Sequence, residues 1–409
     1  MRASRILFAL TPLCALLAAG SVHATNGYFS HGYGIKAKGM GGASVAMTND
    51  TFAGANNPAA AAWAGNRMEV GMDFFSPKRS MDRLGLGNTN SDSNLFYVPE
   101  FGYNRVISDK IGVGVTVYGN GGMNTNYPGE VIPPGGCGPG SPASNLFCGT
   151  GRLGVDMMQL IVAPTLAYKV SENHSIGISP LLVYQTFSVQ GLSAFGVPNM
   201  GYDKSSGFGV RLGYLGKLNE KVSIGASYSP RISMSKFSDY SGLFAEQGDF
   251  DIPENYSLGV SFQATPTVTV AIDYARISYS SIRSIANPSV GLGGPLGSAT
   301  GPGFGWSDID VWKLGAQWQA TPNLAMRAGL NVGDNPISSA DASFNTLAPG
   351  VTTTHYTLGG TYSLSKTTEI SMSYMYAPSN SVTGPNAGGS TDTIKMSQQA
   401  IGIQYGWRW

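Results

Sequence analysis

Strand-like segments in this chain are joined by connections that alternate strictly between short and long. From residue 67 onward there are about 14 such segments, which matches the even strand numbers of outer-membrane barrels. They lie at 67–81, 95–106, 111–120, 156–170, 174–191, 206–218, 221–236, 252–264, 267–283, 308–320, 323–336, 351–364, 367–383 and 394–409. Short turns at one end and long loops at the other are typical of a transmembrane barrel. A soluble sandwich does not sort its loops in this way.

Alternation within the segments supports the same fold. Met372 and Tyr374 fall on one face of their segment, whereas Ser371 and Ser373 fall on the other. An apolar face that continues from strand to strand must meet something large and apolar. In lipid, only a closed barrel satisfies every backbone group of a sheet. We therefore predict an all-β, transmembrane antiparallel β-barrel over residues 67–409. The alternative is a soluble all-β protein with one buried face.

The N-terminus has the features of a secretory signal peptide. Arg2 and Arg5 precede an apolar run at 6–19, and small residues at 22–24 offer a cleavage site after Ala24. The run has about 14 residues, fewer than the roughly 20 that a spanning helix needs. We predict that residues 1–24 are a signal peptide and that the chain leaves the cytoplasm.

The segment that follows is rich in glycine but is not tail-like. Residues 26–59 show neither a strand period nor a sustained helical period. Yet Tyr28, Met40 and Phe52 are side chains that favour burial. A segment of this kind suits packing inside another structure. We therefore predict an N-terminal plug, or hatch, at 25–66 in the lumen of the barrel.

The last predicted strand alternates up to the final residue. Ile401, Ile403, Tyr405, Trp407 and Trp409 share one face. A final strand of this form resembles the signal read by the outer-membrane barrel assembly machinery, although the usual last residue is Phe rather than Trp. The machinery is thus an expected partner during biogenesis.

Composition argues against several classes of function. Charged residues make up 12% of the chain, about half the usual share. Without Arg2 and Arg5, 23 basic residues remain from 25, against 24 acidic residues, so the net charge is −1. A near-neutral chain is not expected to bind nucleic acid. We find no nucleophile elbow and no metal-spaced cluster, and His31 and His355 lie far apart in sequence. We predict no catalytic residue, metal or cofactor.

A tripeptide at the end of the plug adds a family resemblance. Asn57, Pro58 and Ala59 follow the glycine-rich segment and precede the strands. With that pattern, the chain resembles the long-chain fatty acid transporter family of Gram-negative outer membranes (FadL type), which includes members for aromatic hydrocarbons. The resemblance implies a multi-pass protein of the cell outer membrane that takes up hydrophobic compounds passively. It also implies capture at the outer loops, rearrangement of the plug and lateral exit through a kinked third strand.

The sequence also suggests a set of expected partners and leaves a competing hypothesis. Expected partners are outer-membrane lipid, lipopolysaccharide and a hydrophobic small molecule such as a long-chain fatty acid or a hydrocarbon, and the protein is expected to be a monomer. The competing hypothesis is a general diffusion porin for small solutes. A porin has a charged aqueous lumen, whereas the predicted lumen here has little charge.

Two loops supply candidates for an outer groove. Their apolar side chains are costly to expose unless they pack or bind something, and the candidates are Leu192, Phe195, Val197, Met200, Leu243 and Phe244. The alternative is that the loops merely pack on one another.

Glycines in the third predicted strand supply the candidates for a lateral gap. Gly119, Gly121 and Gly122 cannot hold a regular ladder well, so a bulge or kink is expected there. The alternative is an ordinary strand end that runs into a glycine-rich loop.

Two further sets of residues complete the predictions. By strand parity, Arg211, Lys313 and Arg327 face the lumen, where a cation can hold a carboxylate. The alternative for each is structural pairing.

Cys137 and Cys148 lie in a turn-rich loop of an exported protein, so a disulfide between them is expected. The alternative is two free thiols.

Overall fold

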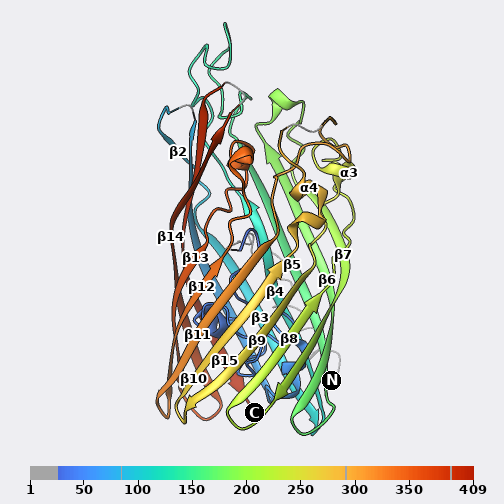
Figure 1. Cartoon of the computed structure of the whole chain (residues 1–409), viewed down its shortest axis with the longest axis vertical. Helices are drawn as coiled ribbons and strands as arrows, with labels where there is room; N and C mark the ends of the chain where they lie inside the picture. Colours follow the sequence, from blue (N-terminus) through green and yellow to red (C-terminus); the bar gives the residue numbers. More distant parts are fainter. Residues whose placement is uncertain (1–25, 84, 291–292, 387–388) are drawn as a thin grey trace, which may run out of the picture.

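Fourteen antiparallel strands form a closed ring in the computed structural model (Figure 1). It describes residues 26–83, 85–290, 293–386 and 389–409, so the predicted signal peptide lies outside the described residues. Neighbouring strands pair in chain order, and β15 pairs with β1 to close the ring. The long loops lie at the top of Figure 1, and the short turns lie at the bottom with the C-terminus. The predicted all-β barrel is confirmed.

The strands are β1 (Arg67–Arg83), β2 (Asn88–Asn90), β3 (Phe96–Ser108), β4 (Ile111–Asn124), β5 (Gly154–Lys169), β6 (His174–Gln190), β7 (Asp203–Lys217), β8 (Val222–Ser229), β9 (Asn255–Thr265), β10 (Val268–Ile277), β11 (Ile309–Thr321), β12 (Leu324–Gly333), β13 (Thr354–Ser363), β14 (Thr368–Pro385) and β15 (Thr391–Arg408). β2 is a short addition that pairs only with the outer end of β1. The helical turns are α2 (Ile35–Lys38), η1 (Pro58–Ala62), η2 (Ser193–Phe195), α3 (Ala245–Gly248), η3 (Tyr279–Ser281), α4 (Arg283–Ala286), η4 (Ser339–Asp341) and η5 (Phe344–Thr346). None of the helices in these described ranges has the length and hydropathy to cross a membrane.

The two faces of the wall differ as the sequence pattern predicted. In β14, Met372 and Tyr374 are exposed, whereas Ser371 and Ser373 are buried toward the lumen. The apolar side chains therefore point outward, where a bilayer covers them. The wall is the reverse of a soluble barrel, because its polar face is the inner one.

Two strands end at least six residues before their predicted ends. β8 ends at Ser229 rather than at 236, and β10 ends at Ile277 rather than at 283. Beyond Ser229 the chain leaves its pairing with β9 and turns over the mouth of the barrel, where Met234 bridges to Gly207. Beyond Ile277 it forms η3 and α4, which bury Tyr279 among the outer loops. Burial of aromatic side chains over the lumen thus ends both strands early.

Residues 26–66 lie inside the ring (Figure 1, blue). Tyr28, Ile35, Met40 and Phe52 are all buried. η1 packs against β5, β6 and β7. The lumen is therefore occupied by packed chain over this stretch.

Candidate functional site

The barrel wall is interrupted between its second and third transmembrane strands. Pairing of β3 with β4 ends at Phe101 and Val117. β3 nevertheless continues to Phe96 against β1, and β4 continues to Asn124 against β5. Residues 96–100 and 118–124 therefore face each other without a ladder, and we call this region the wall break. Pro99 lies within it, and a residue without an N–H suits a strand edge that has no partner.

The predicted gap glycines lie at the wall break. The register of β4 against β5 shifts between Gly119 and Gly121, so the strand carries a bulge there. The plug lies against its inner side: Ser30 N donates to Asn120 O at 3.2 Å, and Gly122 N donates to Tyr28 O at 3.1 Å. A Cβ at Gly121 would lie 1.8 Å from Tyr28 O. Glycine at 121 therefore lets the plug backbone approach the wall.

A small cavity of about 20 Å³ lies behind the wall break, and we call it the gap cavity. The plug contributes His31, Tyr33 and Lys38 to its lining, and the two strand edges contribute Val98 and Gly119. A compartment between plug and wall thus lies where the sheet is unpaired.

Below the gap cavity, α2 is fixed to the wall by charge. Lys36 Nζ lies 2.7 Å from Glu69 Oε1 and 2.5 Å from Glu369 Oε1, and all three side chains are buried. Arg67 and Arg408 also pair with Glu369. Because breaking one partner of a buried ion pair leaves an uncompensated charge, such contacts hold a plug firmly in place.

The other lysine of α2 forms a second buried contact. Lys38 Nζ lies 2.9 Å from Asp73 Oδ2 and 3.2 Å from Glu100 Oε2. Sequence reasoning missed Lys36, Lys38 and most of their partners. The available signal was two lysines in an otherwise apolar plug segment, together with acids at inward positions of β1.

The Asn57-Pro58-Ala59 motif fixes the far end of the plug. Asn57 Oδ1 accepts a hydrogen bond from Ala59 N at 3.1 Å and caps η1, whose first residue is Pro58. Asn57 Nδ2 donates to Val45 O and to Tyr214 O, each at 2.8 Å. One buried amide thus joins two plug segments to β7.

The candidate outer groove is closed in this structure. Leu192, Val197, Leu243 and Phe244 are buried, whereas Phe195 and Met200 are about half exposed. The ring of Phe244 lies 4.6 Å from that of Phe187 and 4.9 Å from that of Phe250, centroid to centroid. These side chains fill the mouth of the barrel. Nearby, burial and the neighbouring Asp251 raise the pKa of Asp249 to about 6.

Two of the three lumen cations line one cavity, and the third lies elsewhere. Arg211 donates to the carbonyl groups of Gly54 and Ala55 and to the Tyr118 hydroxyl, so it supports the plug. Arg327 lies at the short-turn end, where it donates to Gln317 and Thr361. Lys313 and Arg211 both line a cavity of about 50 Å³ between the plug and β7 to β11. The structure therefore brings Arg211 and Lys313 to one cavity, whereas Arg327 lies apart from them.

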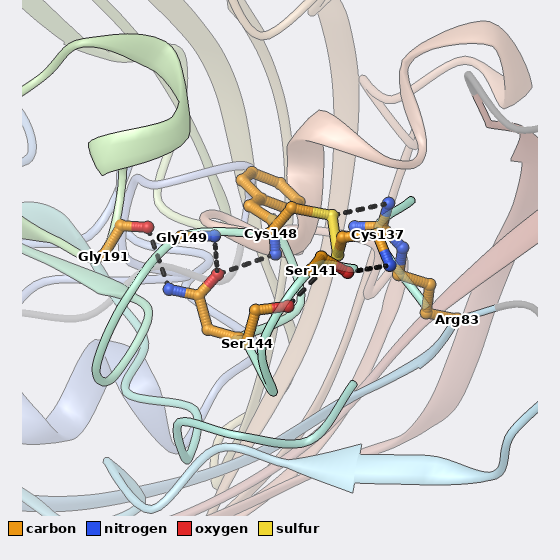
Figure 2. The surroundings of a disulfide bond; sticks show 9 residues. Arg83, Cys137, Ser141, Ser144, Cys148, Gly149 and Gly191 are labelled. Carbon is orange, nitrogen blue, oxygen red and sulfur yellow. Dashed lines mark hydrogen bonds between the residues drawn. A yellow bond between two sulfur atoms is a disulfide. The ribbon is translucent and has the colours of Figure 1, made fainter. Parts of the chain in front are cut away.

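Two pairs of residues that are separated in sequence meet in the structure. Cys137 and Cys148 form a disulfide in the outer loop, beside Arg83 (Figure 2). His31 of the plug and His355 of β13 stack with ring centroids 6.0 Å apart. The disulfide shortens the free length of the outermost loop, and the two rings pack plug against wall.

Comparison with known proteins gives a consistent picture. A family model described as outer membrane protein transport protein (OMPP1/FadL/TodX) matches residues 19–406. The solved structure of the P. putida toluene transporter TodX has a TM-score of 0.71 at 18% identity, and the match covers 93% of this chain and 99% of that one. A Pseudomonas aeruginosa FadL homologue has a TM-score of 0.70 at 15% identity, over 93% and 99% of the two chains. The Ralstonia pickettii toluene transporter TbuX has a TM-score of 0.67 at 18% identity, again over 93% and 99%. A comparison with curated proteins gave no match.

Proposed function

This chain belongs to the outer membrane transport protein family OMPP1/FadL/TodX, and we propose that it takes up hydrophobic compounds passively. The proposed compounds are long-chain fatty acids or hydrocarbons. The observation that carries this proposal is the wall break with a cavity behind it. Irregular backbone at membrane depth is tolerated only where protein buries it or where it lines a cavity, so the break fits a passage through the wall.

The proposed path has three steps. The apolar outer loops capture the solute, the plug segment against β4 shifts, and the solute leaves sideways through the wall break. An apolar solute gains about 0.8 kcal/mol per CH₂ on moving from water into an apolar phase. Exit into the bilayer is therefore more favourable than exit into periplasmic water.

The plug argues against the competing porin hypothesis. Buried plug residues occupy the lumen, and an open aqueous pore needs that space. We expect the intact protein to show only a small conductance in planar bilayers. A large open-state current from the intact protein would favour the porin.

A cross-link across the wall break tests the exit step. Cysteines at Val98 and Gly119, joined by a short bismaleimide, should hold the two edges together. We expect uptake of a labelled hydrocarbon by intact cells to fall at least severalfold, while the barrel stays folded. The control is a cysteine pair at Leu358 and Tyr374, which already face each other in β13 and β14. Normal uptake after complete cross-linking at the break would mean that the exit lies elsewhere.

A further inference from the structure

The gap cavity carries an unmatched negative charge. Lys38 lines the gap cavity and supplies its positive charge. The ammonium group of Lys38 is shared by the carboxylates of Asp73 and Glu100. Both acids line the cavity as well. The remaining lining residues carry neutral side chains, and they are Ser30, His31, Tyr33, Phe75, Val98, Gly119, Tyr118 and Met375. One positive charge therefore faces two negative charges.

Two carboxylate oxygens in this group are left without a partner. Within the described ranges, Asp73 Oδ1 and Glu100 Oε1 are buried and accept no hydrogen bond. An ionised carboxylate can only accept hydrogen bonds, and a buried acceptor without a donor is costly. The group therefore favours a molecule that brings a donor and disfavours one that brings another anion.

The contacts of the other plug lysine show that this imbalance is local. Lys36, Arg67 and Arg408 surround Glu69 and Glu369, so cations exceed acids there. The two groups are anchored on the same short helix, yet only the Lys38 group borders the wall break. A solute that leaves through the break passes the negative group.

We propose that the gap cavity selects neutral hydrophobic molecules that carry a hydrogen-bond donor, such as alkanols or phenols, over ionised carboxylates of the same length. This inference rests on the proposed lateral exit, in which a shift of the plug enlarges the gap cavity. Among the proposed compounds it disfavours ionised fatty acids. The carboxylates of Asp73 and Glu100 accept the hydroxyl of the solute, and their excess charge repels a carboxylate. An unmatched unit charge in a poorly solvated site changes such a preference by about tenfold or more.

The test compares labelled 1-decanol with labelled decanoate at pH 7.5. Initial uptake is measured in intact Gram-negative cells that lack this protein and in the same cells expressing the full chain. We expect the protein to accelerate decanol uptake about tenfold more than decanoate uptake. A wild-type preference for decanoate would overturn the proposal without any variant.

Two single substitutions locate the selectivity. Glu100→Gln and Asp73→Asn each leave Lys38 paired with one remaining carboxylate. We expect each to lower the decanol-to-decanoate ratio about tenfold, mainly by raising decanoate uptake. The matched control is Glu69→Gln, which removes the same charge from the inner face of β1 but does not line the gap cavity. Its ratio should remain that of the wild type.

The outcomes separate this inference from the proposed function. Heat-modifiable migration on gels verifies that each variant is folded. An unchanged ratio in a folded Glu100→Gln or Asp73→Asn protein overturns the inference, as does an equal change in Glu69→Gln. If neither solute enters faster than in cells without the protein while a labelled hydrocarbon does, the inference is overturned and the proposed function stands. If the hydrocarbon is not accelerated either, the proposed function itself fails.

Discussion

The two halves of the plug are held in different ways. Residues 26–34 are held by neutral contacts: Tyr279 Oη donates to Asn26 O at 2.6 Å and accepts from Tyr28 N at 3.1 Å. Within the described chain, no ion pair involves this half. Residues 35–66 are held by the two lysines of α2, and Asp273 of β10 also accepts hydrogen bonds from Ser44 N and Val45 N.

This difference indicates which half can move. A neutral hydrogen bond contributes about 1 kcal/mol net, whereas breaking one partner of a buried ion pair costs about 3–5 kcal/mol. The first half also lies against the wall break, through Ser30 and Tyr28. We therefore expect residues 26–34 to move during transport and residues 35–66 to stay in place.

Deletions should show the largest effect. Removal of residues 25–55 should leave a folded barrel, because the wall strands pair with one another, and should open the lumen to small polar solutes. Removal of residues 25–34 alone should raise conductance far less, because the ion-paired half remains. Single-channel recording compares the two proteins. Equal conductance would remove the distinction between the halves, and loss of folding in the longer deletion would show that the wall needs its plug.

Loss of one lysine should give the next largest effect. Lys38→Met leaves Asp73 and Glu100 without their shared cation, so we expect a loss of about 3–5 kcal/mol of stability. The temperature at which the folded gel species disappears measures this loss. Lys110→Met, at a turn between β3 and β4, is the exposed control and should have no effect. An unchanged transition in Lys38→Met would mean that the second half of the plug is not fixed by charge.

The sequence predicted the wall far better than the plug contacts. Strand parity placed Met372 and Ser371 on opposite faces because a strand has a period of two residues, whatever its neighbours are. The partners of Lys38 depend instead on which side chains the closed ring brings together, and Glu100 is 62 residues away. The same limit applies to the outer loops. Their apolar residues were evident, but whether Phe244 packs or binds a solute depends on tertiary contacts.

A side chain at Gly121 should disturb only the first half of the plug. The Cβ of Gly121→Val would overlap Tyr28 O, so we expect residues 26–30 to leave the wall while the barrel stays folded. Hydrogen exchange should show lost protection at Gly122 N, which donates to Tyr28 O. Gly360→Val is the control, because the nearest atom to its Cβ is 3.6 Å away. Lost protection throughout residues 35–66 would contradict the division of the plug.

The smallest expected effect concerns the link between the outer loops and the plug. Tyr279→Phe keeps the aromatic ring, whose centroid lies 5.3 Å from that of the Tyr28 ring. It removes the hydroxyl that donates to Asn26 O and accepts from Tyr28 N. We expect a loss of about 1 kcal/mol for each hydrogen bond, confined to the N-terminal end. The amide of Tyr28 should then exchange about 30-fold faster, because the two bonds together contribute about 2 kcal/mol and 1.4 kcal/mol corresponds to a factor of ten.

The control for this substitution is Tyr376→Phe, which removes a hydroxyl from a lipid-facing tyrosine of β14. It should leave exchange at Tyr28 unchanged. Because Tyr279 belongs to η3 over the mouth of the barrel, faster exchange in Tyr279→Phe alone would show that the outer loops restrain the segment that lies against the wall break. Unchanged exchange would mean that packing of the Tyr279 ring, and not its hydroxyl, holds the first half of the plug. Capture of a solute at the outer loops would then have to displace that ring in order to move the plug.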